Sequence, residues 1–411
     1  IKSYVNKNLM LGASYNFNFK PWVFEPFKKA KLNSKYLRLI KDFNINPVPK
    51  TLSINSRINR NYNSQQSRNL IEGLLAQPVL KQRRFMFDWD YTVGFDLTKS
   101  LQFNFTANTN HIYDSFGRNE DLEIFDKVFD FGRKNHYHQT LNGTYKIPLD
   151  KIPFLNFVTA DYGYSADFDW QSASKSPIFE NGVQVATIED RVGNMIQNSN
   201  THRLNANFDF GRFYNNIGLK KLLLKGARKS VKGNHKLKNG ASFGDKFMKA
   251  TYDVLTSLKR AKVSYSQTNG MLMQGYKPSV GFLGRNSYNG QLAPTLGFVF
   301  GSQTDILNTA IENNWLVSRQ KSDEYFNQNY GRTEVTKVNY NLSVKPLKTL
   351  TIDFTGNSIK TSALTSQIDV IDTGNGLIQN PEIQTFETGN YSSSHFMLWT
   401  MFTNNNTLFD R

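Results

Sequence analysis

The stretch VTADYGYSADFDW, residues 158–170, decides the fold class. Its even positions, from Val158 to Trp170, are apolar or aromatic, and its odd positions, from Thr159 to Asp169, are small or polar. Successive side chains of a β-strand point to opposite faces, so this alternation predicts a strand with one apolar and one polar face. A soluble strand averages about 5–6 residues, whereas a strand that crosses a bilayer needs about 9–11. The length and aromatic content of the stretch therefore favour a transmembrane β-strand.

The same alternation recurs along most of the chain. It is found in residues 9–19, 85–96, 101–108, 203–210, 337–344 and 350–355. Outer-membrane barrels alternate apolar residues toward lipid with polar residues toward the lumen, in segments of about ten residues separated by turns. The sequence therefore predicts an all-β fold, an antiparallel transmembrane β-barrel with long loops and one or two short helices, and assigns residues 1–411 to one outer-membrane barrel.

The alternation also predicts which side chains face lipid and which face the lumen of the barrel. The predicted lipid-facing residues are Phe85, Phe87, Trp89, Phe103, Phe105, Phe168 and Phe208. The predicted lumen-facing residues are Asp88, Asp90, Asp161, Asp167, Asp169, Asn205 and Asp209. Each set recurs at a period of two residues within its strands, as one face of a sheet requires.

Composition agrees with a barrel and excludes several other classes. Hydrophobic residues make up 39% of the 411 residues and the mean hydropathy is −0.51. No stretch approaches the roughly 18 apolar residues of a transmembrane helix. A spanning β-strand is apolar on one face only, so low hydropathy is compatible with a barrel. Aromatic residues make up 14% of the chain, and barrels gather Trp and Tyr in girdles at the membrane interfaces.

The net charge of +17 and the absence of cysteine narrow the function further. A basic surface suits anionic outer-membrane lipid and lipopolysaccharide head groups. Nucleic-acid binding is not predicted, because the charges are scattered over turns and no nucleic-acid-binding motif accompanies them. Without cysteine, disulfides, thiolate zinc sites and cysteine nucleophiles are excluded.

The alternation and the turn residues predict the order of the elements. Strands are expected near residues 9–19, 51–60, 85–97, 101–111, 135–147, 156–170, 201–213, 258–268, 333–344, 349–359 and 391–402, with weaker candidates at 183–190 and 365–371. Tight turns at 97–100 and 346–349 predict antiparallel hairpins. The connections 20–50, 112–134, 214–257 and 284–332 are long, as loops on one side of such barrels are.

Four features are predicted within the long connections. Residues 32–43 have the spacing of a short amphipathic helix inside the 20–50 loop, and residues 305–314 have that of a second helix. The connection 214–257 is expected to be a basic loop, because residues 220–238 carry eight Lys or Arg and no acidic residue. Contact with phosphate or lipid head groups is the functional alternative for that loop. The 284–332 insertion is expected in the lumen or at a rim, where it would narrow the pore.

No motif for catalysis or for a cofactor is present, and we expect neither an enzyme nor a cofactor. His136 and His138 would share a strand face, but a metal site needs a third ligand and none is evident. Asp88, Asp90 and Asp96 share a face and most simply line water. Glu120, Asp121 and Glu123 lack the spacing of a calcium-binding EF-hand loop. No P-loop, GxGxxG, GxSxG or HExxH occurs.

Several segments, in their order along the chain, resemble the SprA/Sov family. From the N-terminus they are EPFKKAKLNSKYLRLIKDFNINPVPKTLSINSRINRNYNSQQSRNL (25–70), LTKSLQFNFTAN (97–108), IPLDKIPFLNFVTADYGYSADFDW (147–170), GNMIQNSNTHRLNANFDFGRFYNNIG (193–218), VSYSQTNGMLMQGYKPSVGFLG (263–284), APTLGFVFGSQ (293–303) and VKPLKTLTIDFTGNS (344–358). The specificity comes from the order of these segments, since each one alone is a modest match.

This family forms the outer-membrane translocon of the type IX secretion system of Bacteroidota, which is also needed for gliding motility. The resemblance implies that the chain is an interior fragment, an arc of a very large single-chain barrel that passes folded secreted cargo proteins to the cell surface. It also implies two kinds of partner: a protein that plugs the pore or covers a lateral opening, and a smaller outer-membrane barrel that shuttles cargo.

Two other classes share part of the pattern. A substrate-specific porin or a TonB-type outer-membrane receptor would show the same alternation in a smaller closed barrel. A soluble surface adhesin built from β-sandwiches would have shorter strands and fewer interfacial aromatic residues. The length of the full open reading frame would separate the translocon from the porin.

Overall fold

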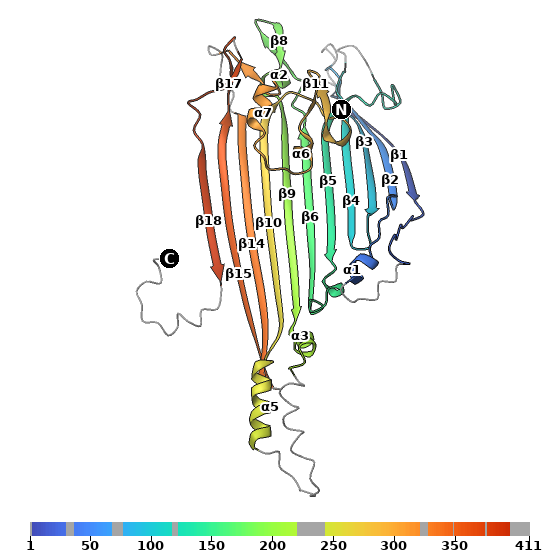
Figure 1. Cartoon of the computed structure of the whole chain (residues 1–411). Coiled ribbons are helices and arrows are strands. Elements are labelled where there is room, and N and C mark those ends of the chain that lie inside the picture. The colour runs from blue at the N-terminus through green and yellow to red at the C-terminus, as the bar shows by residue number, and fades with distance from the viewer. Residues whose placement is uncertain are drawn as a thin grey trace.

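A computed structural model describes residues 2–29, 37–67, 77–116, 122–219, 243–320, 328–347, 349–374 and 376–394. Eleven long strands form one antiparallel sheet (Figure 1). In spatial order they are β1 (Lys2–Asn18), β2 (Thr51–Ser67), β3 (Leu80–Asp96), β4 (Leu101–Tyr113), β5 (Arg133–Ile147), β6 (Val158–Gln171), β9 (Asn194–Asp209), β10 (Leu258–Tyr276), β14 (Gln328–Leu347), β15 (Leu350–Ile368) and β18 (Phe386–Ser394). The predicted all-β, antiparallel character is confirmed.

Short elements lie at the ends of the long strands. The short strands are β7 (Pro177–Glu180), β8 (Val183–Thr187), β11 (Asn286–Tyr288), β12 (Gln291–Ala293), β13 (Ser318–Arg319), β16 (Val370–Asp372) and β17 (Leu377–Gln379). The helices are α1 (Arg38–Lys41), α2 (Ile188–Val192), α3 (Phe210–Asn216), α5 (Phe243–Leu255), α6 (Leu296–Val299) and α7 (Leu307–Glu312), with 3-10 turns at Leu149–Lys151 and Phe282–Gly284. Among the described residues, no helix has the length and apolar character needed to cross a membrane.

Most predicted strands are present, and most of them are longer than the alternation indicated. The prediction for 201–213 is wrong at its C-terminal end, because Asp209 accepts a hydrogen bond from the Arg212 amide and begins α3. The strand predicted at 391–402 is described only as far as Ser394. The two predicted tight turns join β3 to β4 and β14 to β15.

The helix content of two connections differs from the prediction: 214–257 contains a helix that was not predicted, and only part of the helix predicted at 32–43 is described. The basic loop 214–257 contains α5, so the prediction of an irregular loop is wrong over 243–255. Its basic residues 220–238 lie outside the described residues. The helix predicted at 32–43 is described only as the short α1, since residues 30–36 also lie outside them. The second predicted helix, at 305–314, is present as α7.

The register of the ladder defines two faces of the sheet, because directly paired residues point to the same side. One register row crosses ten strands through Tyr15, Ile54, Tyr91, Ala107, Gln139, Phe168, Asn198, Met271, Arg332 and Leu364. We call the face that carries this row the aromatic face. We call the opposite face, which carries Asp90, Asp169 and Asn205, the polar face.

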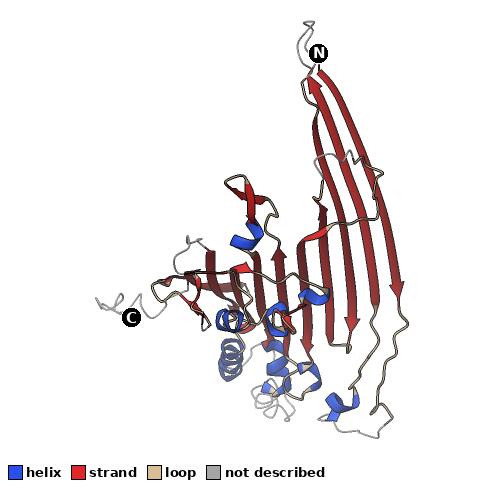
Figure 2. Ribbon diagram, turned by 90° about the horizontal axis from the view of Figure 1, so that it is seen from above, coloured by secondary structure: helices blue, strands red, loops and turns tan. Residues whose placement is uncertain are grey.

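The sheet is curved and does not close (Figure 2). Across the described residues, β1 and β18 each pair with one neighbour and not with each other. Both outer strands are exposed along almost their whole length. The described residues therefore form an open sheet, and they do not close into the expected barrel.

The largest buried cluster lies between the aromatic face and residues 277–319. From the sheet, Tyr137, Phe168, Trp170 and Ile196 are almost fully buried. From the covering segment, the buried residues are Val280, Ala293, Phe298, Val299, Ile306, Ala310, Ile311, Trp315 and Leu316. We call residues 277–319 the collar, and we call the end of the sheet on which they lie the upper end, at the top of Figure 1.

Candidate functional site

The polar face gathers all seven residues that were predicted to face a lumen. Asp90, Asp169 and Gln197 lie in one register row of this face, and Asp167 lies in the next row with Ser199. Asp88, Asp161, Asn205 and Asp209 share the parity of these rows. The chain thus brings the predicted set together on one face of the sheet.

Neutral side chains on neighbouring strands bind the carboxylates of the polar face. Four such donors reach Asp88, Asp90, Asp161 and Asp167: Asn110 Nδ2 at 2.5 Å, Asn55 Nδ2 at 2.8 Å, Asn205 Nδ2 at 2.8 Å and Thr140 Oγ1 at 2.7 Å. These hydrogen bonds run across the strands and fix the side chains against the sheet. Because these carboxylate oxygens already accept hydrogen bonds within the sheet, fewer of their acceptor sites are free to bind a passing protein.

Asp169, whose side chain is 15% exposed, pairs with both histidines of β5. Its Oδ2 atom lies 2.6 Å from His136 Nε2 and 3.4 Å from His138 Nδ1. Within the described part of the chain, no group of three His, Cys, Asp or Glu residues has the arrangement of a metal site. The two histidines and Asp169 therefore form a hydrogen-bonded cluster on the polar face.

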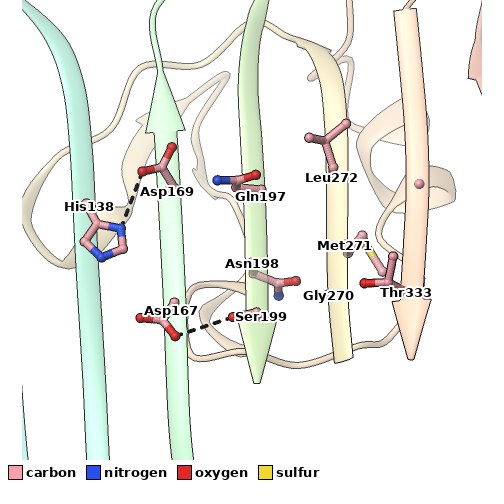
Figure 3. A pocket seen from close by; sticks show the side chains of 11 residues that line it. His138, Asp167, Asp169, Gln197, Asn198, Ser199, Gly270, Met271, Leu272 and Thr333 are labelled. Atoms are coloured by element: carbon pink, nitrogen blue, oxygen red, sulfur yellow. Dashed lines mark hydrogen bonds and ion pairs between the residues drawn. The ribbon is translucent and has the colours of Figure 1, made fainter. Parts of the chain in front are cut away.

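A hollow of about 340 Å³ lies beside this cluster on the polar face (Figure 3). Its floor is formed by Gly270 and Gly331, which follow one another diagonally across β10 and β14, and by Ser199 and Thr333. Glycine inside a strand often marks a place where a ligand or another chain approaches the backbone. Figure 3 shows His138 and Asp169 at one side of the hollow, with their hydrogen bond drawn.

The seven residues that were predicted to face lipid all lie on the aromatic face. Phe85, Phe87 and Trp89 follow one another on β3, and Phe103 and Phe105 do so on β4. The side chains of Phe103, Phe105 and Phe208 are half-exposed. The two predicted sets are therefore on opposite faces of one sheet.

Phe168 and Phe85 are covered by other parts of the chain, so the prediction that they contact lipid is wrong. Phe168 is 0% exposed and its ring lies 6.0 Å from that of Phe298 in the collar. Phe85 is 2% exposed and lies 4.5 Å below the guanidinium of Arg60. Arg60 donates in turn to the carbonyl oxygens of Ile124, Asp126 and Lys127, and so holds a second loop over the face.

Six consecutive carbonyl groups of the collar accept hydrogen bonds from side chains of the sheet. We call this segment, Phe298–Gln303, the latch. The donors are Asn198 to Phe298 at 2.8 Å and to Ser302 at 2.9 Å, Gln139 to Val299 at 2.7 Å, Tyr164 to Phe300 at 2.6 Å, Asn200 to Gly301 at 2.6 Å, and Arg332 to Gln303 at 3.1 Å. Buried main-chain carbonyls need such partners, and here four strands supply them.

The latch shows where the 284–332 insertion lies. Its described part rests on the aromatic face at the upper end of the sheet, which agrees with the predicted position at a rim (Figure 1). The alternative position in a lumen stays a prediction. The physical reason for its position on this face is complementarity: Phe298 and Val299 bury apolar surface against Phe168, and the latch carbonyls meet Asn and Gln side chains. The polar face offers no comparable apolar surface.

On several strands, the aromatic face changes from mainly apolar below to polar above, whereas on β6 all its residues from Val158 to Trp170 are apolar or aromatic. Moving upward on five strands, an apolar residue is followed on the same face by a polar one: Leu9 by Lys7 on β1, Ile58 by Arg60 on β2, Leu141 by Gln139 on β5, Leu204 by His202 on β9 and Val338 by Thr336 on β14. We call the apolar region below this change the open band and its upper limit the edge. The edge runs obliquely to the register rows.

The latch donors were missed by the reasoning from sequence. Asn198 and Asn200 occupy even positions of β9, the same parity as the apolar Leu204, Ala206 and Phe208. A polar residue at a position that points to the otherwise apolar face of a long strand indicates that main chain covers this part of the face. That signal was available in the sequence, but the covering segment lies about a hundred residues away.

No family model matches this sequence, and no curated protein is significantly similar to it. The functional assignment therefore rests on the two faces of the sheet, on the open band and on the resemblance stated above.

Proposed function

We propose that the chain is an arc of an outer-membrane β-barrel and forms part of the wall of a protein-conducting pore, the translocon of the type IX secretion system. The observation that carries the proposal is the oblique course of the open band. A membrane is flat, so a band of lipid-facing residues follows the membrane plane and crosses the register rows only if the strands are tilted.

The slope of the band gives the tilt. Tyr15 on β1 and Arg332 on β14 share a register row. On β1 the upper edge of the band is at Leu9, six residues above that row. On β14 the edge is at Val338, six residues below it. The edge thus shifts by 12 residues over the eight strand-to-strand steps from β1 to β14, or 1.5 residues per step. At about 3.3 Å per residue and about 4.8 Å between strands, this is a tilt of about 45°. Outer-membrane strands are tilted by about 35–45°.

The polar face suits the wall of a wide pore. Its carboxylates already accept hydrogen bonds from Asn and Thr of adjacent strands, so these carboxylates are less available to retain a folded cargo protein. The open edges support a wide pore as well. In lipid, each unpaired backbone group costs several kcal/mol, so we infer that β1 and β18 pair with further strands. Cargo, a plug protein and a smaller shuttle barrel are the partners that the resemblance implies.

A substrate-specific porin or TonB-type receptor is the second candidate. The hollow beside Asp169 favours it, because a glycine floor next to charged groups is what a small polar solute would need. In that case the barrel would enclose a narrower lumen and the hollow would bind substrate.

Two measurements test the proposal. The chain has no cysteine, so single cysteines can be placed at Leu204 and Asn205, neighbours on β9 that point to opposite faces. Leu204→Cys should react with a lipid-soluble maleimide and Asn205→Cys with a charged one. Equal reaction of both variants with the charged reagent would refute the membrane assignment.

The second measurement separates the two candidates by pore size. The protein reconstituted into liposomes should release large dextrans once plugging partners are removed. Release of small solutes only, with binding of one solute lost in Gly270→Val, would favour the porin. Asn207→Val, on the polar face away from the hollow, is the matched control.

A further inference from the structure

The connector between β1 and β2 exposes a patch of large apolar side chains at the lower end of the sheet. The side chain of Trp22 is 64% exposed and that of Phe24 is 53% exposed. Phe27, Leu39, Ile40 and Phe43 are also exposed. Such a patch on a folded protein marks a surface that binds a membrane or another protein.

This patch is held in a defined shape. Phe24 and Ile45 exchange two main-chain hydrogen bonds, at 2.8 and 3.0 Å, and the rings of Phe27 and Phe43 lie 6.5 Å apart. The connector is also tied to the β3–β4 turn, where the Lys99 amide donates to Asn44 Oδ1 at 2.8 Å. The exposed side chains are therefore presented by an ordered loop.

The patch is surrounded by positive charge. The described residues 20–29 and 37–50 contain six Lys or Arg and two acidic residues. Glu25 pairs with Lys28 and Lys99, both at 2.6 Å, and hydrogen bonds from Lys28 and then Lys99 lower the pKa of Glu25 to about 2. Asp42 pairs with two cations as well, Arg38 at 3.7 Å and Lys151 at 3.2 Å. Both acids are thus neutralised and the surface keeps an excess of cations.

The patch continues the open band. Phe17 ends the band on β1 and its ring lies 4.5 Å from that of Phe19, edge to face. Lys20 and Trp22 follow directly. Aliphatic and Phe side chains are thus followed by Lys and Trp. This order is typical of a membrane-spanning segment that passes into the interfacial region.

We infer that the described parts of the connector, residues 19–29 and 37–50, lie in the head-group region of the leaflet at the lower end of the sheet, with Trp22 and Phe24 among the acyl chains and their lysines on anionic head groups. This inference rests on the proposed function, because it takes the open band to face lipid. Aromatic side chains with adjacent lysines are the composition of interfacial anchors, and the excess of cations selects an anionic lipid surface over an apolar protein partner.

The test uses nitroxide labels on single cysteines in the full protein, reconstituted into bilayers with and without phosphatidylglycerol. Labels at Trp22→Cys and Phe24→Cys should be severalfold more accessible to oxygen, and less accessible to a water-soluble nickel chelate, than a label at Asn181→Cys. Asn181 is exposed in the β7–β8 turn at the upper end and is the aqueous control. Leu204→Cys is the lipid control. Omitting phosphatidylglycerol should raise the chelate accessibility at position 22.

The outcomes separate this inference from the proposed function. If position 22 behaves like position 181 while position 204 behaves as lipid-exposed, the sheet spans the membrane and the anchor is refuted. Protection of position 22 from both reagents would indicate a protein partner and would also overturn the inference. If position 204 is itself accessible to the chelate, the open band does not face lipid and the proposed function is refuted.

Discussion

The upper and lower halves of the aromatic face belong to the same strands, yet they are built for different neighbours. On β9, the upper half carries Asn198 and Asn200, which donate to latch carbonyls, and the lower half carries Leu204, Ala206 and Phe208. The upper half packs against main chain, which has polar groups to satisfy. On β9 the lower half has only side chains that need no hydrogen bond, as lipid requires.

This difference explains why parity alone predicts a face but not its surroundings. Both halves follow the period of two residues, and both were assigned to lipid. Chemistry distinguishes them, since a buried Asn or Gln is stable only with a partner. The position at which polar residues enter the aromatic face is therefore the boundary between the open band and the covered end.

The largest expected effect is that of a charge placed in the open band. Ala206→Arg should lower the free energy of unfolding in bilayers by about 2–4 kcal/mol, the cost of an arginine on the lipid face near the midplane. Its neighbour on the polar face, Asn207→Arg, should change it by less than about 0.5 kcal/mol, as surface substitutions do. Urea titration of the reconstituted protein measures both. Equal effects would remove the distinction between the faces.

A smaller effect is expected from removing a latch donor. Asn198→Ala leaves the carbonyl groups of Phe298 and Ser302 without their donor, at a cost of about 1–3 kcal/mol for a buried unsatisfied group. Amide hydrogen exchange in residues 296–303 should rise, while exchange in β4 stays unchanged. Asn207→Ala is the control. If exchange in the collar is unaltered, the latch does not hold it.

The smallest effect expected is an acid dependence confined to the covered end. Burial raises the pKa of Asp369, but hydrogen bonds from Arg319 and Asn380 outweigh it and leave that pKa below its usual value. The Arg319–Asp369 ion pair joins the end of the collar to the residue between β15 and β16. Its contribution is complete above the unfolded pKa of about 3.9 and is lost as the pH falls through the lower folded value.

The ratio of observed to intrinsic amide exchange in the collar, measured between pH 5 and pH 2, should therefore rise at the acid end. Asp369→Asn should abolish this rise, because it removes the titrating group and keeps the shape. A rise that persists in Asp369→Asn would assign the pH dependence to another carboxyl group.

The sequence was sufficient to predict the strands, their antiparallel order and the two faces, because a period of two residues is set by backbone geometry. It was not sufficient for the collar, the latch or the coverage of Phe168 and Phe85. Those contacts join residues far apart in the chain, such as Gln139 with Val299 and Arg60 with Asp126. Helix α5 was missed because the high charge of 220–238 dominated the interpretation of the whole connection.

The tilt of the open band is tested most directly by measuring the depth of residues along it in the bilayer. Ala13, Phe103, Ala206 and Leu342 lie near the middle of the band on β1, β4, β9 and β14. Nitroxide labels on single cysteines at these four positions should report the same depth in the bilayer. Ala13 shares a register row with Tyr330, 12 residues before Leu342, so upright strands would separate the two labels by about 40 Å along the strand direction. A steady change of depth from Ala13 to Leu342, or aqueous exposure of all four labels, would contradict the tilted outer-membrane arc.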